Sequence, residues 1–288
     1  MPNSKHVAQY WRPLSNQRVQ CELCPHYCII INGSMGKCKT RENISGVLYT
    51  LNFGQVLSHA YDPIEKKPLR NFQPGKSIFS IGTFGCNLTC KFCQNHTLVQ
   101  MQGPYPEVED SDIIEMAKRN GSIGIAYTYN EPIVWYEYVR HMSERIRALG
   151  LVNVMVTNGY INEKPMRALL PYIDAMNIDL KAMTNAFYRE TCGGSLEPVL
   201  KTIALCAKHT HVEITNLMID SLNSDLDAFK ELVDFISSVN VDIPLHISRY
   251  FPNHLMTLPT TEIETLKIAR DLARKKLNHV YVGNAYIP

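Results

Sequence analysis

Three cysteines in the segment GTFGCNLTCKFCQN, residues 82–95, have the spacing C-x3-C-x2-C: Cys86, Cys90 and Cys93. Thiolates are the soft ligands that iron–sulfur clusters require, and a short loop lets three sulfurs converge on one cluster. A cubane has one more iron than this loop has cysteines, so one iron keeps an open position, where a small chelating molecule can bind. The pattern therefore predicts a catalytic [4Fe–4S] cluster.

Two alternatives are a zinc knuckle that recruits His96 as its fourth ligand and a set of buried structural cysteines. His96 follows Cys93 by three residues in a tight turn, which suits zinc poorly. Phe92 within the loop is suited to covering a cluster, and Gly85 suits a backbone that bends around an inorganic core. These residues favour the cluster.

The pattern C-x3-C-x-aromatic-C, formed by Cys86, Cys90, Phe92 and Cys93, resembles the signature of the radical S-adenosylmethionine superfamily. The segments DPIEKKPLRNFQPG before it and CQN at its end narrow the resemblance to relatives of the pyruvate formate-lyase activating enzyme. Among these the chain looks most similar to the radical enzymes of the AmmeMemoRadiSam system. The resemblance extends from CELCPHYC to about Pro252.

The resemblance implies an oxidoreductase in which S-adenosylmethionine chelates the open iron. One electron from a ferredoxin- or flavodoxin-like donor would yield a 5′-deoxyadenosyl radical, which takes hydrogen from a substrate. The first hypothesis for the substrate is a backbone glycine of a partner enzyme, as for an activase. The second is a small molecule or another protein side chain. A non-enzymatic metal-binding adaptor is the least favoured function.

The composition fits one large α/β domain with a small appendage: 288 residues, 45% hydrophobic and 19% charged. The net charge is +2 and the Lys and Arg residues are scattered, so we expect no nucleic-acid partner. The sequence has no signal-peptide pattern and no long apolar run, which predicts a cytoplasmic protein without a membrane partner. Nine cysteines then suit metal ligation in a reducing compartment.

Residues 1–50 are predicted to form a turn-rich, Cys-rich N-terminal cap. Its Cys21, Cys24, Cys28 and Cys38 have the spacing C-x2-C-x3-C-x9-C, which predicts a second metal site, either zinc or a second iron–sulfur cluster. The alternative is that Cys28 and Cys38 are simply buried apolar residues. Residues 51–76, punctuated by proline and glycine, are expected to be an irregular connection.

From Ser77 to residue 288 the pattern alternates strand, loop and helix. Strands are predicted at 77–82, 123–129, 152–157, 175–180, 211–218, 244–250 and 279–283. Alternating βα units imply a parallel sheet with right-handed crossovers. Six or so units are too few to close an eight-stranded barrel, so we predict an open, TIM-like partial (β/α)6 barrel, the fold that the resemblance also implies.

Two helices near the C-terminus have a clear apolar period. One places Leu226, Phe229, Leu232, Val233 and Ile236 on one face behind a predicted Ser224 cap. The other places Ile263, Leu266, Ala269 and Leu272 on one face, behind a predicted capping box of Thr261 and Glu264.

The catalytic groups of such barrels gather at the carboxyl ends of the strands. The second strand ends in AYTYNEP, where the resembling family has a Gly-Gly-Glu motif that meets the amino group of S-adenosylmethionine. Both glycines are absent here, but Glu131 keeps the acceptor carboxylate. The alternative is that Asn130 merely caps a helix that starts at Pro132.

The other candidate S-adenosylmethionine contacts follow the later strands. Thr157 and Asn158 belong to a Thr-Asn-Gly turn like that of the family, although Val156 stands where an acid is often found. Asp179 and Lys181 match an Asp-x-Lys feature of activating enzymes near the cofactor carboxylate, with a structural ion pair as the alternative. His246 lies on a polar strand end that should face the same cavity. Cys192 and Cys206 are interpreted as structural.

Overall fold

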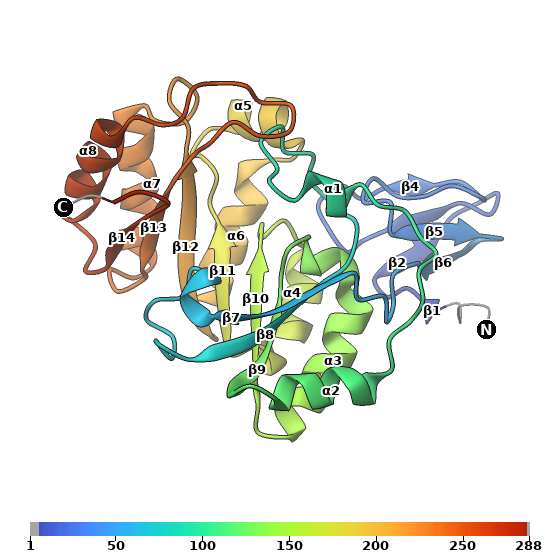
Figure 1. Ribbon diagram of the computed structural model, residues 1–288. Helices are drawn as coiled ribbons and strands as arrows, with labels where there is room; N and C mark the ends of the chain where they lie inside the picture. The colour runs from blue at the N-terminus through green and yellow to red at the C-terminus, as the bar shows by residue number, and fades with distance from the viewer. Residues whose placement is uncertain (1–5, 287–288) are drawn as a thin grey trace.

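The computed structural model describes residues 6–286, and its main feature is an eight-stranded sheet that curves into an open barrel (Figure 1). The strand order is β14-β13-β12-β11-β10-β9-β8-β7, in which β8 to β14 are parallel and β7 is an antiparallel edge strand. These strands are β7 (Ser58–Pro63), β8 (Ser77–Gly82), β9 (Ser122–Tyr127), β10 (Val152–Thr157), β11 (Ala175–Asp179), β12 (His211–Met218), β13 (Leu245–Arg249) and β14 (Val280–Gly283).

Helices lie in every connection between the parallel strands, so the predicted partial (β/α)6 barrel is confirmed. In chain order they are α1 (His96–Val99), α2 (Asp110–Lys118), η2 (Pro132–Trp135), α3 (Tyr136–Ala148), α4 (Glu163–Leu169), η3 (Leu170–Tyr172), α5 (Asn185–Phe187), η4 (Tyr188–Cys192), α6 (Leu196–Cys206), α7 (Leu226–Val239) and α8 (Ile263–Ala273). No helix within residues 6–286 is long and apolar enough to cross a membrane.

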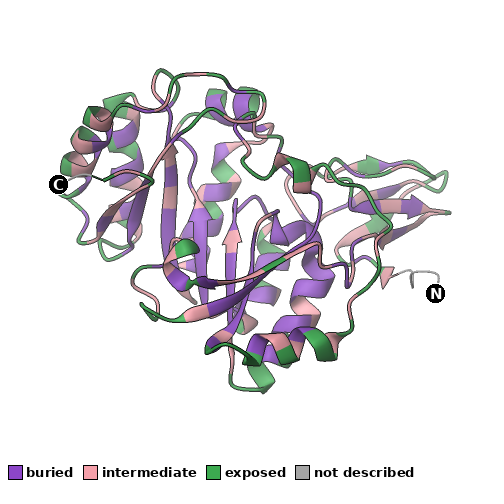
Figure 2. Ribbon diagram, in the orientation of Figure 1, coloured by how far each residue is buried: buried purple, intermediate pink, exposed green. Residues whose placement is uncertain are grey.

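The strands of the barrel are buried over much of their length (Figure 2). Successive side chains of a strand point to opposite faces, one toward the helix-covered core and the other toward the barrel interior. On β11, Met176 and Ile178 pack in the main hydrophobic core under the helices. Asn177 and Asp179, which alternate with them, face the interior, where Asn177 contacts Pro68 and Asp179 borders a cavity. On β11 the interior face is therefore polar from Asn177 onward, and the face toward the helices is apolar.

The segment 51–76 is more ordered than its prolines suggested. It contains β7, which pairs with β8 over its whole length, and the short 3-10 helix η1 (Ile64–Lys66). We call residues 64–72 the strap. Leu69 of the strap packs with Ala126 and Ala175 inside the barrel, in a second hydrophobic core.

The strap reaches the far side of the barrel through hydrogen bonds. The Asn177 amide on β11 donates to the Pro68 carbonyl over 2.8 Å, and the Tyr281 hydroxyl on β14 donates to Asn71 Oδ1 over 2.6 Å. Because Asn177 and Tyr281 lie on strands well beyond β8, the strap crosses the amino end of the open barrel and forms its floor.

The N-terminal cap, blue in Figure 1, lies beside the barrel on the side opposite α7 and α8. It has two small antiparallel sheets, with orders β1-β6-β5 and β2-β3-β4. Their strands are β1 (His6–Val7), β2 (Trp11–Pro13), β3 (Val19–Cys21), β4 (Ile29–Ile30), β5 (Arg41–Ile44) and β6 (Val47–Thr50). Val19 and Leu48 are buried in the same core as the barrel, so the cap packs tightly onto it. The predicted domain bounds include residues 1–5 and 287–288, which lie outside the described residues.

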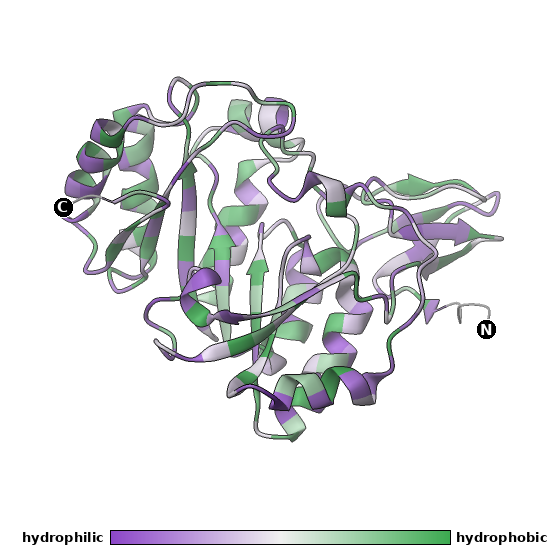
Figure 3. Ribbon diagram, viewed as in Figure 1, coloured by the Kyte–Doolittle hydropathy of each residue, from purple (hydrophilic) through white to green (hydrophobic). Residues whose placement is uncertain are grey.

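The two predicted helix caps were wrong. Asp225, not Ser224, caps α7, because its carboxylate accepts from the Ala228 N–H over 2.9 Å. The Thr261 hydroxyl donates to the Met218 carbonyl instead of capping α8. Helix α7 carries both hydrophobic and hydrophilic residues (Figure 3). Its predicted apolar face is buried except for Leu226, its first residue, which is 46% exposed.

Candidate functional site

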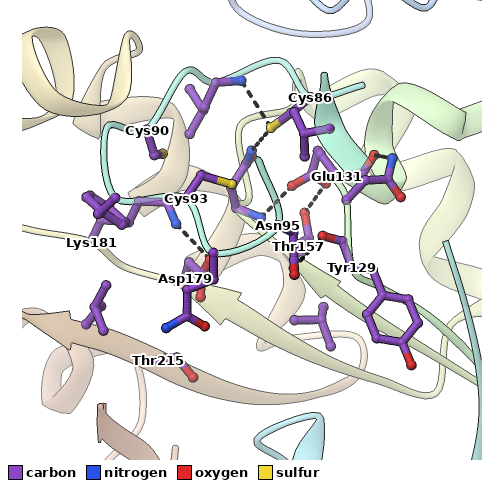
Figure 4. Close-up of a pocket in the computed structure, with 18 of the residues that line it drawn as sticks. Cys86, Cys90, Cys93, Asn95, Tyr129, Glu131, Thr157, Asp179, Lys181 and Thr215 are labelled. Atoms are coloured by element: carbon purple, nitrogen blue, oxygen red, sulfur yellow. Dashed lines mark hydrogen bonds and ion pairs between the residues drawn. The ribbon is translucent and has the colours of Figure 1, made fainter. Parts of the chain in front are cut away.

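The cysteines of the C-x3-C-x2-C pattern lie in the loop that follows β8, at the carboxyl end of the barrel (Figure 4). We call residues 83–95 the cysteine loop. Cys86, Cys90 and Cys93 all border one cavity of about 270 Å³. Side chains from the ends of β9 to β12 face these thiols across the cavity, among them Glu131, Thr157, Asn158, Asp179, Lys181 and Thr215.

Gly85 lets the cysteine loop approach the cap. Its φ is +87°, and a Cβ there would lie 2.2 Å from Cγ2 of Thr40 and 2.9 Å from the Cys38 carbonyl oxygen. Only glycine avoids both the backbone strain and the clash. The bend expected at this residue is therefore also the point where the cap and the cysteine loop touch.

Asn130 organises the start of the cysteine loop, a function that the sequence did not reveal. Its side-chain oxygen accepts from the Thr83 N–H over 3.0 Å, and its amide nitrogen donates to the carbonyls of Phe84 and Gly85 over 3.2 and 3.1 Å. The alternative that Asn130 caps the following helix is wrong, because the side chain of Glu131 caps η2. The only available signal was its place beside Glu131 at a strand end.

Glu131 is a buried carboxylate, 3% exposed, that joins the ends of β9 and β10. Its Oε1 accepts from the Thr157 hydroxyl over 2.7 Å and from the Ile133 N–H over 3.0 Å, and its Oε2 accepts from the Asn158 N–H over 2.8 Å. Burial nevertheless raises the pKa of Glu131 to about 7. Within residues 6–286 no Lys, Arg or His forms a salt bridge with this carboxylate.

Asn158 connects this carboxylate to the cysteine loop. Its amide nitrogen donates to Asn87 Oδ1 over 2.9 Å and lies 3.7 Å from the Cys86 sulfur. The backbone N–H of Leu88 also donates to that sulfur, over 3.3 Å. The Thr-Asn turn predicted to line the pocket therefore lies between a buried carboxylate and a candidate metal ligand.

Asp179 and Lys181 form an ion pair, with Nζ of Lys181 2.8 Å from Oδ2 of Asp179, and both border the cavity. Burial alone would lower the pKa of Lys181, but Asp179 and the nearby Cys90 hold it well above its usual value. The ammonium also lies 5.6 Å from the centre of the Phe92 ring. The pair is consistent with both interpretations of the sequence, a cofactor contact and a structural ion pair, because it is internal and still faces the cavity.

His246 does not border the cavity. Its Nε2 lies 2.6 Å from Oε2 of Glu213, whose carboxylate also accepts from the strap N–H groups of Arg70 and Asn71 over 3.0 and 2.7 Å. Burial would raise the pKa of Glu213, but these partners and His211 lower it to about 2. We therefore assign His246 to the floor of the barrel, where it helps to hold the strap.

The four cysteines of the cap surround a much smaller cavity. Cys21, Cys24, Cys28 and Cys38 border a space of about 20 Å³, near the buried Arg41. Burial, with smaller contributions from the neighbouring cysteines, raises the pKa of Cys24 to about 12. In the described part of the chain no three His, Cys, Asp or Glu side chains have the geometry of a single bound metal ion, so the metal of this site stays a prediction.

The donor set around the larger cavity fits an iron–sulfur cluster. In such a cluster each thiolate binds a different iron, so the sulfurs do not have to meet at one point. Burial and the nearby Glu131 raise the pKa of the Cys86 thiol well above its usual value. A thiol in this setting becomes a thiolate when a metal cation binds it. The cavity beside the three sulfurs also has room for a further molecule.

A family model described as the Radical SAM superfamily matches residues 80–236. The chain is 43% identical over 284 residues to an uncharacterised protein of Methanocaldococcus jannaschii, and the alignment covers 96% of this chain and 84% of that protein. It is 28% identical over 207 residues to a second protein of the same organism, provisionally named as a glycyl-radical enzyme activating enzyme, with 69% and 77% of the two chains covered.

Among solved structures, a domain of the pyruvate-formate lyase-activating enzyme from Bacteroides vulgatus is similar to the barrel. The match covers 56% of this chain and 99% of that one, with a TM-score of 0.50 and 18% sequence identity. At this identity the likeness supports the fold alone.

Proposed function

Because this chain belongs to the radical SAM superfamily, and is thus an enzyme of radical chemistry, we propose that it cleaves S-adenosylmethionine reductively and abstracts hydrogen from a substrate. Membership implies a [4Fe–4S] cluster and S-adenosylmethionine as cofactors. The observation that carries the proposal is the cavity, which is bordered by Cys86, Cys90 and Cys93 and by Glu131, a buried carboxylate that forms no salt bridge within residues 6–286.

In this proposal the three cysteines of the loop hold the cluster. When bound, the cluster and S-adenosylmethionine supply the electron transfer and the carbon–sulfur cleavage that gives the 5′-deoxyadenosyl radical. The chain binds, orients and shields them. Asn130 fixes the loop that carries the thiols, and Phe92, 6% exposed and bordering the cavity, is proposed to shield the bound cluster from water.

Glu131 is proposed to accept hydrogen bonds from the ammonium of S-adenosylmethionine. A buried carboxylate without a cationic partner is costly, and a bound ammonium would supply that partner. Thr157 and Asn158 hold the carboxylate in place through the hydrogen bonds described above. Lys181, oriented by Asp179, is proposed to meet the carboxylate of S-adenosylmethionine.

A ferredoxin- or flavodoxin-like protein is the proposed electron donor. The cysteine loop offers an accessible contact, because Lys91 within it is exposed. All nine cysteines are free, which supports a reducing, cytoplasmic location.

For the substrate we propose a protein segment, as in an activating enzyme. The relative named as a glycyl-radical enzyme activating enzyme supports this class. Because the strap forms the floor, a substrate would enter from the carboxyl end of the barrel. There Leu255, 70% exposed, is held against the cysteine loop by a hydrogen bond from its N–H to the Lys91 carbonyl, and Phe251 is 42% exposed. Exposed apolar side chains of this kind suit contact with another protein.

The central test is anaerobic reconstitution of the full chain, reduction, and chromatography of the nucleoside products. We expect 5′-deoxyadenosine from the parent and none from Cys90→Ala, because a cluster without one ligand is not held in its working state. Cys206→Ala is the matched control, since this buried cysteine lies in α6 and does not border the cavity. Formation of 5′-deoxyadenosine by Cys90→Ala at the parent rate would refute the proposal.

A second experiment separates a protein substrate from a small molecule. The enzyme is incubated with extract from cells grown in deuterated medium, divided by ultrafiltration into protein and small-molecule fractions. Deuterium in the 5′-deoxyadenosine is expected only with the protein fraction. Deuterium from the small-molecule fraction alone would favour the second substrate class, for which the polar Thr215 and Ser248 in the cavity wall are suited.

A further inference from the structure

A separate cavity lies on the outer face of the sheet, between the segment that follows β11 and the start of α7. Its volume is about 230 Å³, and it shares no lining residue with the cavity at the cysteine loop. On β12, Thr215 and Leu217 border the cavity at the cysteine loop, whereas Asn216 between them borders this one. Because successive side chains of a strand point to opposite faces, the sheet separates the two cavities. We call the cavity beside Asn216 the outer cavity.

Asn216 has an unused hydrogen-bond acceptor at the outer cavity. The side chain is 1% exposed. Its amide nitrogen donates to the carbonyls of Leu180 and Lys181 over 2.8 and 3.2 Å, so the nitrogen is fixed toward the end of β11. Its Oδ1 therefore points the other way, and this oxygen has no hydrogen-bond partner among the described residues. A buried acceptor without a partner is costly, and a donor bound in the outer cavity would supply that partner.

The neighbouring amide of Asn223 does not supply the donor that Asn216 lacks. Asn223 also borders the outer cavity and is buried. Its nitrogen donates to the carbonyls of Lys181 and Leu217 over 2.7 and 2.8 Å. Its oxygen accepts from the Ile219 N–H over 2.7 Å. An amide nitrogen has two hydrogens to donate, and both are used here.

The other walls of the outer cavity indicate the class of ligand. Met183, Phe229 and Leu232 give it an apolar wall, and the exposed Asp225 borders it with a carboxylate. None of the Lys, Arg and His residues that the structure describes borders it. A cavity of about 150 Å³ with apolar walls holds one benzene ring, so the outer cavity has room for a ring with a small substituent. An anion would meet a carboxylate and an acceptor, which disfavours it.

We infer that the outer cavity binds a small uncharged molecule that has an apolar body about the size of one aromatic ring and a hydroxyl or amino group, which donates a hydrogen bond to Oδ1 of Asn216. The apolar body packs against Phe229 and Leu232. The inference goes beyond the proposed function, because binding in the outer cavity requires neither a cluster nor S-adenosylmethionine at the cysteine loop.

The experiment titrates the full-length chain, labelled with carbon-13 in its methionine methyl groups, with phenol, toluene or benzoate. Spectra are recorded before and after anaerobic reconstitution, so a failure of this inference is distinguishable from a failure of the proposed function. The methyl group of Met183 reports on the outer cavity, and that of Met166, which is buried in the core and does not border this cavity, is the control signal.

We expect phenol to shift the Met183 signal to saturation and to leave the Met166 signal in place. Toluene has nearly the same shape as phenol but no donor, so it should bind about tenfold more weakly. Benzoate should not bind. Absence of a saturable Met183 shift with phenol would overturn the inference, because the outer cavity would then hold only water. Equal affinities of phenol and toluene for the parent would also overturn it, as would tighter binding of benzoate than of phenol.

Three variants test where the ligand lies. Ala228→Leu fills the outer cavity and should abolish phenol binding, whereas Ala204→Leu makes the same change at a half-buried alanine of α6 and should not. Asn216→Leu removes the acceptor, so phenol and toluene should then bind equally. Unchanged phenol binding by a folded Ala228→Leu protein would contradict the inference. Should a variant fail to fold, the comparison of phenol with toluene on the parent decides.

Discussion

The cysteines of the loop and the cysteines of the cap lie on either side of the contact between Gly85 and Cys38, yet their surroundings differ. The loop cysteines border a cavity of about 270 Å³, and the cap cysteines border one of about 20 Å³. The carbonyl of Cys38 lies close to Gly85, so the two groups are neighbours. One group adjoins space for a small molecule, and the other adjoins space for little more than a single atom.

The charges around the two groups differ in the same way. Near the loop cysteines, Glu131 forms no salt bridge within the described residues, and Lys181 faces the cavity with Asp179. Near the cap cysteines, Arg41 is 1% exposed and is neutralised by Glu137, with a further hydrogen bond from its guanidinium to the Cys21 sulfur over 3.6 Å. Exchange of a small ligand suits the first environment, and a permanently held metal suits the second.

The largest expected effect is on metal content. In a triple variant with Cys86, Cys90 and Cys93 replaced by Ala, any remaining metal must be bound elsewhere, and we expect about one zinc per chain at the cap cysteines. A cavity of about 20 Å³ has room for a single atom the size of a water molecule and not for a cluster. Elemental analysis by mass spectrometry after removal of free metal gives the count.

The reverse variant is the control. With Cys21 and Cys24 replaced by Ser, the zinc should be lost while iron stays at the loop cysteines. About four irons in the triple variant would mean an electron relay instead of a structural cap. Absence of any metal from the triple variant would remove the second site altogether.

The next effect is on stability. Arg41→Met leaves the buried Glu137 carboxylate without its cation, which should reduce the free energy of unfolding by about 3 to 5 kcal/mol. Arg12 and Glu22 form an exposed pair in the same cap, with side chains 56% and 40% exposed, so Arg12→Met should cost about 1 kcal/mol or less. Denaturant titration of both variants tests the contrast. Equal losses would mean that the buried Arg41–Glu137 pair contributes no more to stability than the exposed Arg12–Glu22 pair.

The sequence was informative where the signal is local. The cysteine spacing and the period of the parallel strands depend on a few neighbouring residues, and β8, β10 and β12 begin and end where predicted. The strands of the cap were missed because they have at most four residues, too few to display a period. Strand β7 was missed because its pairing with β8 is apparent from the fold and not from the residues of β7 themselves.

The sequence also did not predict how far along the barrel axis each side chain lies. His246 and Ser248 lie on the same face of β13, as alternation predicted, but two residues along a strand span about 6.6 Å. That distance separates the floor, where His246 meets Glu213, from the cavity that Ser248 borders. The alternation of residues shows which face of a strand a side chain occupies, but not how far along the barrel axis it lies. No pattern in the sequence could therefore have excluded His246 from the cavity.

The smallest expected effect concerns Glu131. It distinguishes a buried carboxylate at the cavity from buried carboxylates elsewhere in the barrel. Glu131→Ala should weaken S-adenosylmethionine binding about ten- to a hundredfold, since a charge-assisted hydrogen bond contributes roughly 1.5 to 3 kcal/mol. Iron content should stay unchanged, because the carboxylate is proposed to contact the ammonium and not the iron. Anaerobic equilibrium dialysis of the loaded enzyme measures the affinity.

Glu213→Gln is the matched control, because Glu213 is also a buried carboxylate of the barrel but already has His246, His211 and two strap N–H groups as partners. It should destabilise the floor and leave the affinity for S-adenosylmethionine near that of the parent. Thr157 and Asn158 would keep donors without an acceptor in Glu131→Ala, so Glu131→Gln, which keeps an acceptor oxygen, checks for local collapse. If both Glu131 variants bind as tightly as the parent, the carboxylate serves only to cap η2 and to join β9 to β10, and the open site must recognise the ammonium through other groups.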